Sequence, residues 1–163
     1  MDRRQFISAL LAASAGMACA AHASTTSRDM VTFVRELYTA QAAAQIADAH
    51  QSSAEFDALF SRKVRALMSA PKVHPDKRLD GPILNVFFGW GVLPKLPVTL
   101  DNVAPAADAT GSLALVRVDM TFRGEKRQIL VRPVREGGTW RIADISYGSG
   151  PGLVAYYRRI TGR

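Results

Sequence analysis

An aspartate within an apolar strand pattern is the residue of this chain best placed for acid–base chemistry. Trp140, Ile142 and Asp144 occupy alternate positions of one β-like segment, so they fall on one face of a strand. Burial beside apolar side chains raises the pKa of a carboxyl group and suits it to act as a general acid or base. The alternative is a structural carboxylate that bonds a backbone amide or an arginine such as Arg117 or Arg132. We favour the structural alternative, because most aspartates in such positions are structural.

No other set of residues has the spacing of a catalytic or metal-binding motif. His50 and His74 lack a second histidine at ligand spacing, and a metal site needs three or four converging ligands. The glycine-rich run at residues 148–152 matches neither a nucleophile elbow nor a phosphate-binding loop. We therefore expect no metal ion and no cofactor. Any catalysis would have to use Asp144 as the general acid or base.

Basic residues crowd the segment predicted to form the later strands, with seven Lys and Arg between residues 117 and 141. The chain has 21 Lys and Arg against 14 Asp and Glu, a formal net charge of +7. Arginines on the wet face of a sheet would attract an anionic component of the cell envelope. A charged face that only keeps the protein in solution is the alternative. Nucleic acid is not expected, because exposed aromatic residues do not alternate with the basic ones. The arginines assigned to this face are Arg117, Arg123, Arg127 and Arg132.

A strongly apolar segment at residues 83–93 interrupts a proline-rich stretch. Its prolines exclude long regular elements, so a loop or a short helical turn is expected. Such a segment either lines an apolar ligand pocket or fills the gap between helices and sheet, and we favour the second interpretation. The residues predicted to line a pocket with it are Tyr38, Phe87, Trp90, Trp140 and Tyr147.

The elements that must position these residues follow from hydrophobic periodicity. Apolar residues recur at helical spacing from residue 29 to about 49 and from 53 to 69, with Ser53 as the N-cap of the second helix. Helices followed by a run of strands indicate an α+β domain, with N-terminal helices packed on an antiparallel sheet of three to four strands. The strands are expected at 98–103, 113–123, 127–136 and 139–147, with a bulge or edge at Pro133, a hairpin turn at Gly137 and Gly138, and a short C-terminal helix at 153–160.

The first residues have the pattern of an export signal. Arg3 and Arg4 precede an Ala-rich apolar run at residues 7–18 that is too short to span a membrane. Residues 3–7, Arg-Arg-Gln-Phe-Ile, partly match a twin-arginine signal, and an ordinary secretory signal is the alternative. A small-x-small pattern ending at Ala23 predicts cleavage before Ser24.

This signal predicts an address and a domain organisation. Residues 1–23 are expected to be removed, and residues 24–163 to form one domain in the periplasm or outside the cell, with no integral membrane span. Attachment of a lipid to Cys19 is the weaker alternative, because Gly16 stands where such signals usually have Leu. One cysteine also excludes a disulfide framework.

Three segments resemble a family of small exported bacterial proteins that is a domain of unknown function. They are residues 33–38 (Phe-Val-Arg-Glu-Leu-Tyr), 60–67 (Phe-Ser-Arg-Lys-Val-Arg-Ala-Leu) and 138–145 (Gly-Thr-Trp-Arg-Ile-Ala-Asp-Ile). The family resembles the nuclear transport factor two-like superfamily, and this implies a cone-shaped fold in which a curved sheet wraps on helices. It implies little chemistry, because the same cone serves isomerases, dehydratases, binding modules and assembly subunits. A homodimer through the open sheet would suit this architecture.

The sequence thus predicts a non-catalytic periplasmic binding or interaction module with an apolar pocket and a basic sheet face. Its partner would be a small apolar ligand or an anionic envelope component. The alternative is a small-molecule isomerase, dehydratase or hydrolase with Asp144 as general acid or base. The two differ in one observable, since a catalytic Asp144 must face a cavity.

Overall fold

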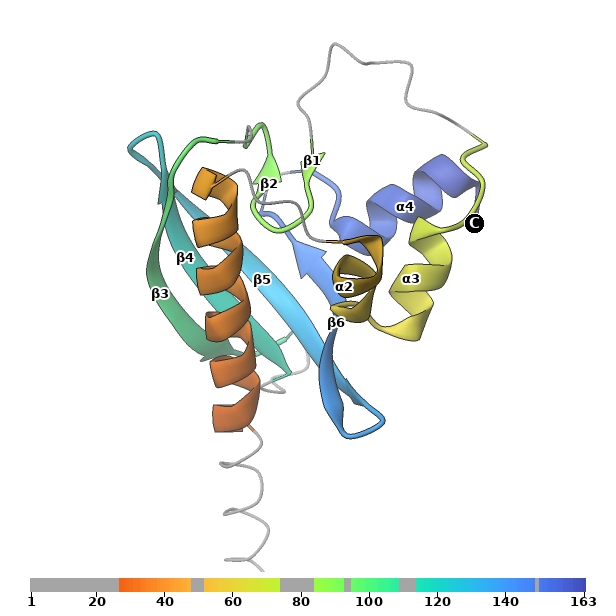
Figure 1. Ribbon diagram of the computed structural model, residues 1–163, viewed down its shortest axis with the longest axis horizontal. Coiled ribbons are helices and arrows are strands. Elements are labelled where there is room, and N and C mark those ends of the chain that lie inside the picture. The colour runs from red at the N-terminus through yellow and green to blue at the C-terminus, as the bar shows by residue number, and fades with distance from the viewer. Residues whose placement is uncertain (1–26, 48–51, 74–83, 93–94, 109–113, 149) are drawn as a thin grey trace, which may run out of the picture.

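Four antiparallel strands form the central sheet in the computed structural model, which describes residues 27–47, 52–73, 84–92, 95–108, 114–148 and 150–163 (Figure 1). The strands lie side by side in chain order. Two-residue turns with positive φ at both positions join the last three, which suits the twist of a hairpin. The strands are β3 (Val98–Ala106), β4 (Leu115–Phe122), β5 (Glu125–Glu136) and β6 (Thr139–Ser146).

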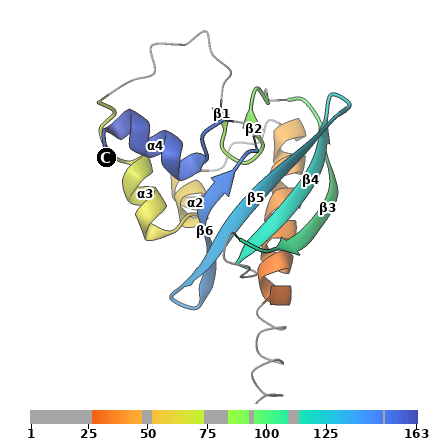
Figure 2. The ribbon, with the colours of Figure 1, turned by 180° about the vertical axis from the view of Figure 1, so that it is seen from behind.

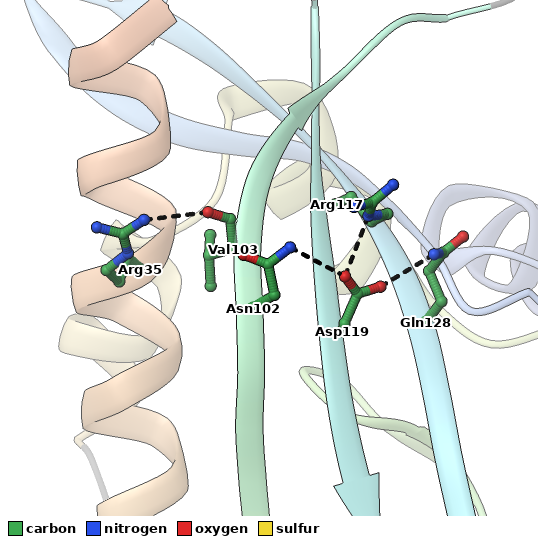
Figure 3. Close-up of polar contacts among 6 residues, drawn as sticks. All are labelled: Arg35, Asn102, Val103, Arg117, Asp119 and Gln128. Atoms are coloured by element: carbon green, nitrogen blue, oxygen red, sulfur yellow. Dashed lines mark hydrogen bonds and ion pairs between the residues drawn. The ribbon is translucent and has the colours of Figure 1, made fainter.

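A long N-terminal helix, residues 27–47, covers one face of this sheet. Its apolar stripe, which includes Val34 and Tyr38, belongs to the same buried core as the inward-pointing residues of β4. Arg35 fixes the helix to the edge strand, since its Nη2 atom donates a hydrogen bond to the carbonyl oxygen of Val103 at 3.1 Å (Figure 3). Figure 2 shows the opposite face of the sheet without a covering helix.

Three short helices gather beyond β6 at the other end of the sheet (Figures 1 and 2). They are α2 (Ser53–Ala58), α3 (Arg62–Met68) and α4 (Leu153–Thr161). The fold is therefore α+β, as the order of the predicted elements indicates. Within the described residues, no helix has the length and apolar character needed to cross a membrane. The predicted export signal, Cys19, His50 and His74 lie outside the described residues.

The single helix predicted at residues 53–69 is wrong, because the chain leaves the helix at Phe60. Phe60 forms a parallel bridge with Ile142 of the edge strand β6. The N–H of Ser61 donates to the carbonyl oxygen of Ile142 at 2.8 Å, and the N–H of Ile142 donates to that of Leu59 at 2.9 Å. Bonds to the sheet edge thus replace helical bonds while Phe60 enters the core.

Serine side chains begin both helices that flank this break. The Ser61 hydroxyl accepts from the N–H of Val64 at 3.4 Å at the start of α3. The N-cap of α2 is Ser52 rather than the predicted Ser53, because Ser52 and Glu55 form a reciprocal capping box. The break thus buries Phe60 in the core and gives α3 a serine cap.

The apolar segment before β3 is a small hairpin instead of a loop or helical turn. Two-residue strands, β1 (Leu84–Asn85) and β2 (Gly89–Trp90), pair antiparallel. The Oδ1 atom of Asn85 shapes the turn by accepting from the N–H groups of Phe87 at 3.1 Å and Phe88 at 3.2 Å. Both phenylalanine rings are buried in the core, so the hairpin fills the gap between helices and sheet.

Candidate functional site

Asp144 does not lie on the core face of β6, contrary to the sequence pattern. A register shift places Arg132 opposite Asp144 and Pro133 opposite Ile142, which leaves Ala143 as an extra residue in β6. An irregularity is therefore present at Pro133, where the sequence predicts a bulge or an edge, but the extra residue belongs to β6. Such a bulge reverses the alternation of the strand, so Ile142 and Ile145 are both buried and Asp144 shares the opposite face with Arg132.

The Asp144 carboxylate has backbone partners. Its Oδ1 atom accepts hydrogen bonds from the N–H of Ile145 at 2.9 Å and from the N–H of Val154 at 3.1 Å. Val154 belongs to the first turn of α4, whose N-cap, Gly152, provides no side-chain acceptor. The sequence left open whether Asp144 is catalytic or structural. These bonds are those of the structural alternative, in which the carboxylate accepts from a backbone amide. Asp144 lines neither of the two cavities described below.

The four arginines predicted to form one basic face are divided between the two sides of the sheet. Arg117 pairs across strands with Leu130 and lies on the uncovered face, as Arg132 does. Arg127 instead lies opposite Met120, which is fully buried, and so points to the core side. Arg123 occupies a turn with φ 52°. The prediction of one shared face is therefore wrong, because the strand register separates Arg127 from the others.

Carboxylates accompany the cations on the uncovered face (Figure 3). Asp119 accepts hydrogen bonds from Gln128 Nε2 at 2.9 Å, Arg117 Nε at 3.1 Å and Asn102 Nδ2 at 3.3 Å. These bonds, that from Gln128 most of all, hold the pKa of Asp119 below its usual value. Arg132 pairs with Asp108 at 3.6 Å. Positive charge on this face is thus partly neutralised.

Four of the five aromatic residues predicted to line a pocket meet around the β1–β2 hairpin. Tyr38 contacts Phe87 edge to face, with ring centroids 6.3 Å apart. The Tyr147 hydroxyl donates to the carbonyl oxygen of Val86 at 2.7 Å, and Trp90 Nε1 donates to that of Pro151 at 3.3 Å. Tyr38 and Phe87 are core residues, whereas Trp90 is half-buried.

Trp140 is separate from this group. It lies in the β5–β6 hairpin, where the guanidinium of Arg135 sits 5.7 Å from the centre of its ring. Arg135 and Trp140 are cross-strand partners, so their contact is a property of that hairpin. Trp140 therefore does not share a site with the other four aromatic residues.

A cavity of about 410 Å³, named here the hairpin cavity, opens where β2 approaches the start of β5. One wall is apolar and contains Trp90 and Tyr147, both predicted from the sequence. The rim is polar and contains Arg127, whose Nη1 donates to the carbonyl oxygen of Trp90 at 2.8 Å. Its lining residues are Phe88, Gly89, Trp90, Met120, Glu125, Lys126, Arg127, Gln128, Ile129, Tyr147 and Gly148.

Sequence reasoning missed the β5 residues of this cavity. Lys126 and Gln128 alternate with inward-facing residues, as surface residues of any strand do. Only the approach of β2 to the start of β5 makes them a rim, and no local pattern in the sequence signals that approach.

A second cavity of about 430 Å³, named here the helix cleft, lies between α3 and α4. Its lining residues are Lys63, Ala66, Leu67, Arg158 and Arg163. No cluster of three or more His, Cys, Asp or Glu side chains suited to a metal ion occurs in the described part of the chain.

Comparison of the chain with protein-family models, curated proteins and solved structures finds no match. The resemblance of three sequence segments to a family of exported proteins therefore stays a prediction.

Proposed function

We propose that this protein is a non-catalytic binding module of the cell envelope, and that the hairpin cavity holds a small molecule with an apolar body and an anionic group. The cavity carries the proposal. Its volume of about 410 Å³ lies in the range of small-molecule sites, which combine apolar walls with a few polar groups. Two cations and one carboxylate line the rim, and Arg127 pairs with Glu125 at 3.4 Å. Lys126 therefore carries the net positive charge of the rim, which favours an anion.

The apolar wall of the cavity is held in place by hydrogen bonds. Arg127 bonds the carbonyl oxygen of Trp90, and Tyr147 bonds that of Val86. The β1–β2 hairpin is therefore tied to β5 and to the end of β6 before any ligand arrives. A preformed wall lowers the entropic cost of binding. The catalytic alternative is not proposed, because the bonds of Asp144 Oδ1 serve the backbone.

The chain offers its own reporter for this site. It contains two tryptophans, of which Trp90 lines the hairpin cavity and Trp140 does not. Trp140→Phe leaves Trp90 as the sole tryptophan, and Trp90→Phe gives the converse reporter. Titration of the first variant with decanoate should give a saturable change of fluorescence. Shortening the acid should weaken binding by about 0.8 kcal/mol for each CH₂ lost.

A matched pair of variants tests the contribution of the rim. Lys126→Ala removes a rim cation, whereas Arg123→Ala removes a cation from the adjoining β4–β5 turn that does not line the cavity. Decanoate should bind more weakly to Lys126→Ala than to Arg123→Ala, and decanol should bind both alike. Equal affinities of the two variants for decanoate, or an equal fluorescence response in Trp90→Phe, would contradict the proposal.

The envelope address rests on residues 1–23 alone. Mass spectrometry of protein taken from the envelope fraction of expressing bacteria should show a mature chain that begins at Ser24. An unprocessed chain confined to the cytoplasm would contradict the address and leave the cavity proposal intact. Native mass spectrometry of the same sample would reveal any retained ligand and the oligomeric state.

A further inference from the structure

The helix cleft is a concave feature of the described chain that is lined mainly by basic residues. Helices α3 and α4 lie side by side in both views (Figures 1 and 2). Three of the five residues that line the cleft between them are cations, and the other two are Ala66 and Leu67. None of the five lines the hairpin cavity. The cleft is thus separate from the site proposed above.

The α3 wall of the cleft combines charge with an apolar base. Lys63, Ala66 and Leu67 are three and four residues apart, so they share one face of the helix. Leu67 is buried, whereas Lys63 is exposed. The long aliphatic stem of a lysine can follow such an apolar surface while its ammonium group stays at the mouth.

The α4 wall owes its two cations to the way the helix ends. Gly162 adopts a left-handed conformation with φ 67°, which a glycine accepts at little cost. The turn brings the N–H of Arg163 back to the carbonyl oxygen of Arg158 at 3.0 Å. Backbone hydrogen bonding therefore holds Arg163 next to Arg158, although five positions separate them in the sequence.

No acidic residue belongs to either helix wall. The sequences of α3 and α4 contain no Asp or Glu. Arg62 and Lys63 stand in the first turn of α3, where the helix dipole disfavours positive charge. Glu136 of β5 offsets part of that cost by accepting a hydrogen bond from the N–H of Arg62 at 3.0 Å. The helix dipole thus gives no reason for a cation at Lys63, whereas it favours Arg158 in the last turn of α4.

We infer that the helix cleft binds a phosphate group carried by a small molecule or by a lipid headgroup. Arginine guanidinium groups match pairs of phosphate oxygens, and an ammonium group supplies a further donor. Three cations suit a group with more than one negative charge better than they suit a single carboxylate. The apolar base of Ala66 and Leu67 accommodates the atoms that adjoin the phosphate.

The test compares the contributions of Lys63 and of its neighbour Arg62 to the binding of a phosphate compound. Lys63→Ala removes a lining cation, and Arg62→Ala removes an exposed cation from the adjacent position that does not line the cleft. Calorimetric titration with sodium pyrophosphate at low ionic strength should show binding by the unaltered protein. Lys63→Ala should weaken it about tenfold, as expected for one charge-assisted hydrogen bond, and Arg62→Ala should weaken it much less. Lys63→Arg should restore most of the affinity.

Vesicles distinguish the two sources of phosphate. Sedimentation with phosphatidylcholine vesicles, with and without phosphatidic acid, measures binding to a lipid headgroup. Binding that needs phosphatidic acid and Lys63 assigns the site to a lipid, whereas pyrophosphate binding without vesicle binding assigns it to a soluble phosphate ester. Equal losses in Lys63→Ala and Arg62→Ala, or no binding of either probe, would overturn the inference. Decanoate titration of the same variants should be unchanged and also reports that they fold.

Discussion

Asp144 holds the beginning of α4, because its Oδ1 atom accepts a hydrogen bond from the N–H of Val154 at 3.1 Å. The same oxygen accepts from the N–H of Ile145 at 2.9 Å. The first N–H groups of a helix lack partners within the helix, and Gly152 at the N-cap has no side chain to offer. A carboxylate from the neighbouring strand thus performs the capping.

Asp144→Ala should lower the free energy of unfolding by about 1 kcal/mol, the usual cost of losing a helix cap. Asp144→Asn should cost less, since an amide oxygen can still accept both bonds. Urea denaturation followed by circular dichroism measures both changes. Unaltered stability of Asp144→Ala would show that the hydrogen bond to Val154 contributes nothing to the free energy of unfolding.

Tyr38 and Tyr147 should respond in opposite directions to loss of the hydroxyl group. The Tyr38 hydroxyl is buried and has no hydrogen-bond partner among the described residues, and burial raises the pKa of its phenol well above the usual value. Tyr38→Phe should therefore raise the free energy of unfolding by about 1 kcal/mol. Tyr147→Phe loses the bond to Val86 at 2.7 Å and should lower it by about 1 kcal/mol.

Denaturant titrations of these two variants under one set of conditions give the comparison. Both substitutions keep the ring and its packing, so the sign of each change reports the hydroxyl group. A loss of stability in Tyr38→Phe equal to that in Tyr147→Phe would show that the Tyr38 hydroxyl has a partner in solution.

Gly152 allows α4 to start close to β6. A Cβ atom at this position would lie 2.9 Å from the carbonyl oxygen of Ile145, which is too close for the backbone to accept without moving. Gly152→Ala should lower the free energy of unfolding by about 1–3 kcal/mol. Combined with Asp144→Ala the loss should be smaller than the sum, because both changes affect one junction. A double-mutant cycle measures the coupling, and strict additivity would argue against a shared junction.

Asp119 should make the stability of the protein depend on pH in the acid range. Hydrogen bonds from Gln128, and more weakly from Asn102 and Arg117, lower the pKa of this carboxylate in the folded state. The unfolded state therefore binds the proton more tightly, and the stabilisation is present above the unfolded pKa of about 4. It is lost as the pH falls through the lower pKa of the folded state.

Variants at two positions isolate this effect. Asp119→Asn should be less stable than the unaltered protein at neutral pH, and the difference should shrink as the pH falls below about 4. Gln128→Ala should raise the pKa of Asp119 in an NMR titration, because it removes the largest stabilising hydrogen bond. An Asp119 pKa that is the same in both proteins would assign the shift to other groups.

Local patterns were sufficient to predict most elements of the sheet. Alternation of apolar and polar residues identifies β4, whose inward residues Val116, Val118 and Met120 are fully buried. The hairpin turn at Gly137 and Gly138 also follows from residue type, since both positions need positive φ. These features depend on residues next to one another in the chain, and the sequence displays them directly.

Contacts between distant segments overruled the local pattern where the two disagreed. Residues 53–69 have an unbroken helical pattern, yet Phe60 pairs with Ile142 and divides the helix. A bulge or an edge at Pro133 follows from the sequence, but the position of the extra residue in β6, and so the face of Asp144, depends on the pairing of the two strands. Register is a relation between two strands, so one strand read alone assigns the wrong face.

The sequence by itself determined the class of fold, the inward face of β4 and the hairpin turn at Gly137 and Gly138. Only the tertiary structure determines where the two cavities lie and which residues line them. It brings β2 to the rim formed by Lys126 and Arg127, and it sets Lys63 beside Arg158 across two helices. Periodicity records which side of an element avoids water, whereas a binding site depends on which elements meet, and long-range packing and backbone hydrogen bonds decide that.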